Sequence, residues 1–435
     1  MKGGTKISLF WFRRDLRLED NTALDHALRS GLPVQALFIF DRNILEELPP
    51  DDARVDFIYR NLQSIHQRLR KAGSSLLVRH GDPLAIWKKL TAEHAIESVY
   101  VNRDYEPYAL ERDKQVELLL RQKNIRFFSF KDQVIFEKDE VLKNDGTPYT
   151  VFTPYKNRWL QEFGATPPRP REDPDFRAFL KSGHTIPALS ELGFRESRRK
   201  VKEYDLSVID RYEETRDFPA ADATSYLSPH LRFGTVGIRR VISRLDDTHG
   251  VFLSELIWRE FFMQILFHFP RVVSQNFRAR YNGIAWRNRE DEFERWCRGV
   301  TGYPMVDAGM RQLEQTGYMH NRVRMVTASF LCKHLLIDWR WGESYFARKL
   351  LDYELSSNNG NWQWAAGTGC DAAPYFRIFN PEEQMKRFDP ELEYVKKWLP
   401  EHGTSDAPVP MVDHRTARSR ALETYRKALE DPIVF

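Results

Sequence analysis

The densest group of chemically useful residues is the segment 356–369, which reads Ser-Ser-Asn-Asn-Gly-Asn-Trp-Gln-Trp-Ala-Ala-Gly-Thr-Gly. Its glycines and small polar side chains let a backbone approach a flat ligand closely, and Trp362 and Trp364 offer aromatic faces for stacking. A tight turn between helices, with both tryptophans in the core, is the alternative interpretation. The mixture of amides, glycines and indoles favours a binding site for a planar ligand.

Two helical patterns carry further candidates. Asn321 and Met325 are four residues apart and therefore share a helix face, where an amide beside a thioether suits a flat, partly apolar ligand such as a base. Met325 by itself is also typical of a core residue. Glu255 precedes Trp258 by three residues, so its carboxyl group lies beside an indole and is able to hydrogen-bond a substrate. The alternative is a surface salt bridge between Glu255 and Arg259.

The segment Thr224-Ser225-Tyr226-Leu227-Ser228 precedes another helical pattern. Thr224 and Ser225 are predicted to form a helix N-cap, where hydroxyls and free backbone N–H groups bind phosphate well. A plain N-cap without a ligand is equally compatible with these residues. The chain has no Walker loop, no GxGxxG after its first strand, no HExxH metal spacing and no GxSxG nucleophile elbow.

The overall composition is that of a globular protein of two or three domains. The chain has 435 residues, is 42% hydrophobic and has a net charge of +4. Residues 261–289 and 223–245 contain arginines but no acid, so they are candidates for tracking a phosphate backbone, with solvated helix faces as the alternative. The three cysteines form no CxxC pair, which argues against a disulfide framework or zinc site and favours a reducing cytosol. No apolar run is long enough to cross a bilayer.

Strand and helix patterns alternate over the first ~130 residues, which predicts a parallel sheet covered on both faces. Helical patterns, one of them opened by Pro83, separate the strands. Residues 131–205 contain turns and a Pro/Arg-rich stretch at 166–171, and are predicted to form a long, partly helical connection. From residue 206 onward strand signals disappear, which predicts an all-helical domain. The expected strands are 7–12, 34–40, 75–78, 98–102 and 126–130, and the expected later helices include 252–267, 305–313, 322–336 and 345–355.

Five motifs together resemble the DNA photolyase and cryptochrome family, most closely its class I-type enzymes for cyclobutane pyrimidine dimers. The motifs span nearly the whole chain in the family's order. They are FWFRRDLRLEDN (10–21), TSYLSPHLRFG (224–234), ELIWREFF (255–262), TGYMHNRVRM (316–325) and SSNNGNWQWAAGTGCDAAPYFRIFN (356–380). The resemblance implies an α/β, Rossmann-like antenna domain at 1–130, a linker at 131–205, and a helical domain at 206–435 that binds FAD and DNA.

The same resemblance implies the cofactor site. Asn358 would face the reactive nitrogen of the central flavin ring, and because Asn cannot donate an acidic proton it favours a reduced, anionic FAD. Arg324 would pair with Asp352, and Glu354 stands where the family usually has Asp. The remaining implied FAD contacts are Tyr212, Thr224, Ser225, Tyr226, Leu227 and Ser228, the last five near the phosphates. The segment Asn102 to Tyr108 resembles the family's antenna region, without deciding between a folate and a deazaflavin.

The resemblance further implies how electrons and substrate are handled. Trp362, Trp339 and Trp286 match the electron-transfer chain from flavin to surface. The pocket for a cyclobutane dimer is implied for Glu255, Trp258, Asn321, Met325 and Trp364, and relatives that repair (6-4) photoproducts carry His at positions 321 and 325. DNA contacts are implied for Arg216, Arg259, Arg322 and Gln384. No metal is expected.

These residues imply a light-dependent lyase that repairs DNA damage. Excited, reduced FAD would give an electron to a flipped-out dimer and take it back after the ring splits, with Glu255 and Asn321 hydrogen-bonding the dimer carbonyls. The alternative is a cryptochrome, a blue-light photoreceptor without repair activity; Asn358 and the lack of a long tail after Tyr425 speak against it. We expect a cytoplasmic monomer, associated with the nucleoid when bound to DNA, without a membrane or obligate protein partner.

Overall fold

The computed structural model describes residues 5–165 and 167–430. Thr166, the first residue of the predicted Pro/Arg stretch, and residues 431–435 lie outside this part. Contacts along the chain group the protein into two compact units, which are described separately. Unit 1 comprises residues 1–137, 161–204 and 226–246, and unit 2 comprises residues 138–160, 205–225 and 247–435.

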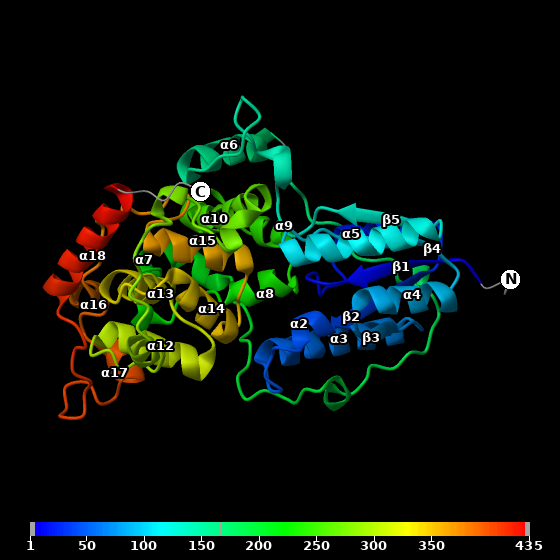
Figure 1. Ribbon diagram of the computed structural model, residues 1–435. Coiled ribbons are helices and arrows are strands. Elements are labelled where there is room, and N and C mark those ends of the chain that lie inside the picture. Colours follow the sequence, from blue (N-terminus) through cyan, green and yellow to red (C-terminus); the bar gives the residue numbers. More distant parts are fainter. Residues whose placement is uncertain (1–4, 166, 431–435) are drawn as a thin grey trace. The chain divides into compact units, whose positions relative to one another are not determined.

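Unit 1 is built on a five-stranded sheet in the order β3-β2-β1-β4-β5, and every pair of neighbours is parallel (Figure 1). All residues of the two strands β1 and β2 are buried, because helices cover both faces. The alternation of side chains divides β1 between two cores, with Phe10 and Phe12 in one and Leu9 and Trp11 in the other. The predicted strands are confirmed: β1 Ile7–Phe12, β2 Val34–Asp41, β3 Leu76–Gly81, β4 Ile96–Asn102 and β5 Arg126–Phe130.

The helices that flank the sheet begin with residues that cap helices well. Asn21, Asp52 and Asp82 each accept a backbone N–H in the first turn of the helix that follows, and Pro83 occupies the first turn of its helix as predicted. The helices of unit 1 are α1 Thr22–Leu28, α2 Arg42–Leu45, α3 Ala53–Lys71, α4 Pro83–Glu93, α5 Pro107–Gln122, α8 Leu227–Phe233 and α9 Ile238–Ile242.

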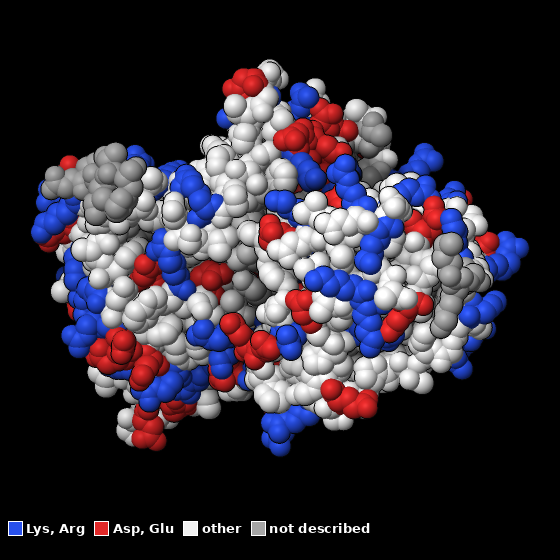
Figure 2. Space-filling view, turned by 45° about the vertical axis from the view of Figure 1, so that its right-hand side comes forward, with Lys and Arg blue, Asp and Glu red and all other residues white. Residues whose placement is uncertain are grey.

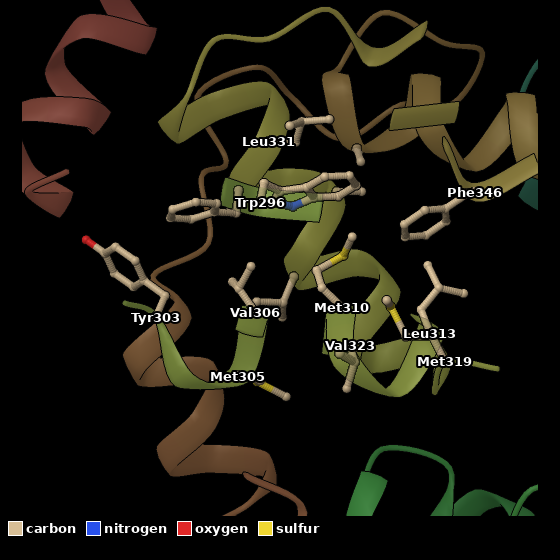
Figure 3. Packing of buried hydrophobic residues seen from close by; sticks show 14 of the residues in the cluster. Trp296, Tyr303, Met305, Val306, Met310, Leu313, Met319, Val323, Leu331 and Phe346 are labelled. Carbon is tan, nitrogen blue, oxygen red and sulfur yellow. The ribbon is translucent and has the colours of Figure 1, made fainter. Parts of the chain in front are cut away.

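Unit 2 has no strand among its described residues and forms helices around one large apolar cluster, as the sequence predicted for the region after 206. Trp296 is fully buried in this cluster, and Figure 3 shows its indole among Val306, Met310 and Leu331. The main helices are α6 Phe152–Ala165, α7 Tyr212–Thr215, α10 Gly250–His268, α11 Glu290–Cys297, α12 Pro304–Thr316, α13 Asn321–Ser329, α14 Trp339–Lys349, α15 Leu355–Ala366, α16 Pro381–Phe388, α17 Glu393–Trp398 and α18 His414–Glu430.

Two local predictions were wrong, those for the helix at 345–355 and for the N-cap of α8. The helix expected at 345–355 is two helices, because the chain leaves the helical conformation between Lys349 and Leu355. The segment 356–369, singled out as a candidate site for a flat ligand, is mostly helix α15: Glu354 caps its start and Gly367, at φ 82°, ends it. The N-cap of α8 is Tyr226, not Thr224 or Ser225. The third residue of that helix is a proline, which has no N–H. A hydroxyl cap would therefore have one backbone donor fewer to accept from.

A buried lysine fixes the end of α15. Lys333 lies in a single π-helical turn, Phe330–His334, and is 1% exposed. Its ammonium group donates to the carbonyl oxygens of Ala366 at 2.8 Å and Tyr375 at 3.3 Å, and lies 3.8 Å from the ring centre of Tyr425. Burial lowers the pKa of Lys333 to about 7. The carboxyl end of α15 is thereby held against α18.

Within the described residues, no helix combines the length and apolar character needed to span a membrane. The same residues contain no group of three or more His, Cys, Asp or Glu side chains arranged to hold a metal ion. The three cysteines are free thiols.

Candidate functional site

The side chains expected to bind substrate on α10 are joined to α7. The carboxylate of Glu255 pairs with Arg216, Oε1 to Nη2 at 2.8 Å, and the guanidinium of Arg216 lies 5.2 Å from the ring centre of Tyr212. Burial, with the charge of Glu255 close by, raises the pKa of Tyr212 to about 12. Glu255 therefore pairs across the fold with Arg216, a predicted DNA contact, whereas the sequence alternative was a pair with Arg259.

The candidate residues on α13 are held by Asp217, the residue that follows Arg216 in the sequence. Its carboxylate pairs with Arg322, Oδ1 to Nη2 at 2.6 Å, while the other terminal nitrogen of Arg322 lies 3.9 Å from the sulfur of Met325. Asn321, the first residue of α13, is exposed. His320 caps the helix by accepting the backbone N–H of Arg322, and burial lowers the pKa of this imidazole to about 4.

One predicted DNA contact, Gln384, lies on α16 near Arg322. The guanidinium of Arg322 stacks 4.2 Å from the ring centre of Phe388 on the same helix. The side-chain oxygen of Gln384 and the Nε of Arg322 are both buried and have no hydrogen-bond partner among the described residues. Polar atoms left in this way cost free energy unless a ligand or water satisfies them.

The residues implied for the flavin come mainly from the start of α15 and the turn before it. Arg324 pairs with Asp352, Nη2 to Oδ2 at 2.9 Å, as expected. Glu354 is buried and accepts the backbone N–H of Ser357 at 3.0 Å and the hydroxyl of Ser356, so its carboxylate caps the start of the helix. Glu354, at a position where the family usually has Asp, thus still caps the helix.

Asn358 is oriented by a carboxyl group that the sequence analysis did not single out. Its amide nitrogen donates to the backbone oxygen of Glu343 at 3.1 Å and to Oε1 of the same residue at 2.9 Å. Burial raises the pKa of Glu343, while the bond from Asn358 opposes that rise. No local sequence signal links the two residues, since α14 and α15 bring them together only by packing.

The three tryptophans implied for electron transfer belong to the large apolar cluster of unit 2. Trp362 and Trp339 are almost fully buried, and Trp286 is partly buried against the cluster. The indole N–H of Trp339 donates to Asn276 Oδ1 at 2.8 Å, and the ring of Trp286 meets Tyr425 edge-on, with centres 6.0 Å apart. Trp364, implied for the substrate pocket, is half-buried against the same cluster.

The five implied phosphate contacts at 224–228 are described in two parts, because the division between the units falls between Ser225 and Tyr226. In unit 2, Ser225 accepts the backbone N–H of Asp205 through its carbonyl oxygen at 2.9 Å, and Thr224 is half-buried. In unit 1, Tyr226 has a positive φ of 51° and its hydroxyl receives a hydrogen bond from Lys202 at 2.6 Å. Leu227 and Ser228 form the first turn of α8.

Several arginines of the two acid-free stretches have acidic partners from other parts of the chain. Arg239 is 8% exposed and pairs with both Asp20 and Asp132, and Arg287 pairs with Glu292. Lys and Arg side chains are interspersed with Asp and Glu on the face shown in Figure 2. Arg239 is therefore buried among counter-charges that its local sequence lacks, whereas Arg287 has an acidic partner only five residues away. That these stretches contact DNA stays a prediction.

The antenna-like segment lies at the carboxyl edge of the sheet, which is where parallel α/β sheets bind ligands. Asp104 and Glu106, which follow β4, both receive Arg14 from the end of β1, at 3.0 and 2.9 Å. Arg232 also reaches Glu106, at 3.1 Å. The positive charges hold the pKa of Asp104 well below its usual range against the effect of burial.

Comparison with known proteins shows the family of this chain. Residues 8–174 match the family model described as DNA photolyase, and residues 252–409 match the FAD binding domain of DNA photolyase. A deoxyribodipyrimidine photo-lyase of Halobacterium salinarum is 38% identical, over 98% of this chain and all of the relative.

Solved structures show the same fold over nearly the full length. A bacterial class III photolyase from Agrobacterium tumefaciens has a TM-score of 0.86 at 35% identity and covers 99% of both chains. An archaeal photolyase from Sulfolobus tokodaii, solved with two FAD molecules, has a TM-score of 0.85 at 33% identity, over 97% of this chain and 99% of its own. With its motifs, its fold and these relatives in agreement, the chain belongs to the DNA photolyase and cryptochrome family of FAD-binding proteins, on its photo-lyase enzyme branch.

Proposed function

We propose that this enzyme uses light to repair cyclobutane pyrimidine dimers in DNA. The family and the names of the relatives support a DNA photo-lyase. The pocket residues Glu255, Asn321 and Met325 support the cyclobutane dimer as substrate, because neither position 321 nor position 325 holds the histidine that the (6-4) enzymes carry.

One structural observation carries the proposal: two consecutive residues connect the helices that hold the proposed pocket. Arg216 pairs with Glu255 on α10, and Asp217 pairs with Arg322 on α13. Both ion pairs are partly exposed, so their charges remain within reach of a charged ligand. The residues proposed to recognise a dimer and those proposed to hold the DNA backbone therefore meet at one place in unit 2.

This arrangement assigns a role to each charge. A DNA phosphate is a stronger partner for Arg216 and Arg322 than the carboxylates they hold in the free protein, so binding would exchange one anion for another. Glu255 is then released toward the dimer. A carboxylate paired with Arg216 accepts hydrogen bonds, so in this proposal its partner on the dimer is an imide N–H. Asn321, with an amide N–H to donate, remains the candidate for the carbonyl.

The residues near α15 fit a flavin nucleotide. The amide nitrogen of Asn358 donates to two oxygens of Glu343, so the side-chain oxygen is the atom offered to a ligand, and it would accept from a ring N–H such as that of a reduced flavin. Arg324 and Asp352 add a charged pair beside it. When bound and reduced, FAD supplies the light-driven electron that opens the dimer. The chain positions the dimer, excludes water and stabilises the transient negative charge.

The proposal is tested by illuminating the FAD-loaded protein with a thymine-dimer oligonucleotide, single- and double-stranded, and separating products by chromatography. We expect intact thymines under blue light, none in the dark, and no change in a parallel (6-4) oligonucleotide. A protein that binds reduced FAD but leaves the cyclobutane dimer intact under light would overturn the proposal in favour of a photoreceptor.

We also propose that the carboxyl edge of the sheet in unit 1 accepts an antenna pigment near Asp104 and Glu106. The absorption spectrum of the purified protein distinguishes a folate, a deazaflavin and a second flavin. A spectrum that contains one FAD alone, even after incubation with each of the three pigments, would contradict this proposal.

A further inference from the structure

Helix α6 lies within the segment that the sequence assigned to a linker, yet its first part packs on α10 in unit 2. Phe152, Tyr155 and Trp159 recur at helical spacing and are 7%, 1% and 1% exposed. The indole N–H of Trp159 donates to Glu260 Oε1 at 2.6 Å, and the ring of Tyr155 lies 5.2 Å from that of Phe261. These contacts fix the position of α6 along α10 (Figure 1).

The start of α6 covers Trp258. The rings of Phe152 and Trp258 are stacked, with centres 3.6 Å apart and planes inclined by 8°. Phe152 also meets Phe261 edge-on, with ring centres 5.8 Å apart. Its backbone N–H donates to Asp371 Oδ2 at 3.1 Å, so the first turn of α6 is held by a residue beyond α15. Phe152 is therefore a fixed surface, and the indole has a parallel ring to pack against.

We propose that Phe152 is a positioning residue for substrate recognition: it fixes the plane of the Trp258 indole beside Glu255. This inference rests on the proposed function, in which Trp258 forms one wall of the dimer pocket. Without the stacked ring, the indole of a half-buried tryptophan regains other side-chain rotamers, and ordering it again on binding costs free energy. A wall that is fixed before binding favours the rigid, bent shape of a fused dimer over two separate bases.

The first measurement follows Trp258 in the protein without DNA. The chain is labelled with 5-fluorotryptophan, and the fluorine resonance of Trp258 is assigned by its loss in Trp258→Phe. We expect Phe152→Leu, which retains apolar volume, to shift or broaden that resonance, and Phe152→Tyr, which retains the ring, to preserve it. The matched control is Tyr155→Phe at the same helix interface, because the Tyr155 hydroxyl is buried without a hydrogen-bond partner among the described residues. An unchanged Trp258 resonance in Phe152→Leu would overturn the proposal.

The second measurement is the ratio of dissociation constants for undamaged and dimer-containing oligonucleotides. Losing part of the aromatic stacking on the dimer predicts an about three- to tenfold lower ratio for Phe152→Leu. We expect a normal ratio for Phe152→Tyr and Tyr155→Phe. A changed resonance with an unchanged ratio would refute the role in recognition. If Trp258→Phe also leaves this ratio unchanged, the proposal that Trp258 forms a wall of the dimer pocket is refuted as well. If Phe152→Leu does not fold, Phe152→Met takes its place in both measurements.

Discussion

Asn358 and Glu343 are joined by two hydrogen bonds, both donated by the amide nitrogen of Asn358, one to the backbone oxygen and one to the side chain of Glu343. The pair fixes the orientation of the Asn358 amide. The partner residue Glu343 is half-buried, so water competes for this bond less than it would at an open surface.

The first prediction concerns this orientation. Glu343→Leu removes the side-chain acceptor and lets the amide of Asn358 turn, whereas Glu343→Gln retains an oxygen at the same reach. Losing a hydrogen bond worth about 1.5 kcal/mol predicts about tenfold faster air reoxidation of the reduced FAD-loaded protein in Glu343→Leu, and a smaller change in Glu343→Gln. Visible absorption at the flavin band follows the reaction. Identical reoxidation in all three proteins would show that Glu343 does not orient Asn358.

The second prediction concerns Glu255. Glu255→Ala removes an acceptor from the proposed pocket but also releases Arg216 from its ion pair. We expect the yield of repaired dimers per absorbed photon to fall about tenfold, the size of one hydrogen bond to a charged group. Affinity for undamaged DNA should stay equal or rise, since Arg216 becomes available to phosphate. Equal losses of repair and DNA binding would refute the specific role of Glu255.

The third prediction uses a glycine that the tryptophan packing requires. A Cβ built on Gly342 would lie 2.1 Å from the ring of Trp362, so Gly342→Ala must displace that indole at a cost of about 1–3 kcal/mol. We expect slower photoreduction of FAD by external reductant, in the direction of Trp362→Phe. Gly164→Ala is the matched control, because a Cβ on this helical glycine meets open space. Comparable photoreduction in both alanine variants would contradict the packing argument.

The fourth prediction concerns pH. The pKa of His320 is lowered to about 4 in the folded protein, whereas an unfolded histidine titrates near about 6.5. Between these values the unfolded chain binds more protons, so the free energy of unfolding decreases as the pH falls from 6.5 towards 4, by at most about 1.4 kcal/mol per pH unit from this residue.

Urea unfolding at several pH values checks this slope. His320→Asn supplies a side-chain oxygen that still caps α13 but does not titrate, so we expect a shallower pH dependence with similar stability at pH 7. If the wild-type protein and His320→Asn lose stability in parallel between pH 6.5 and 4, His320 is not the source of the effect.

Local signals predicted the sheet and most helices correctly. The strand at Ile7–Phe12 ends where Arg13 interrupts an apolar run, and Pro83 starts its helix, so the necessary information lies within a few residues. Local signals say less where tertiary packing decides. Segment 356–369 has poor helix formers and was assigned no helix, yet α15 forms there because Glu354 caps its start and packing against α10 and α14 stabilises it.

The candidate site likewise combines residues that the sequence identified with residues that only tertiary packing reveals. Family motifs named Asn358 and Glu255, but Glu343, Asp217 and Phe152 act through contacts that span 15 to 106 positions in the sequence. The local sequence likewise gives the wrong charge environment for Arg239, because its partners Asp20 and Asp132 lie far from it along the chain.

The placement of α6 on α10 constrains how this protein can be divided. A fragment starting at residue 206 would leave Trp258 and Phe261 without the helix that covers them, and a fragment ending at 205 would carry the matching aromatic face with nothing to pack on. Neither half is thus a free-standing module, and both are expected to aggregate when expressed alone. Any evolutionary exchange of the sheet-containing unit for another would have to leave residues 138–160 behind.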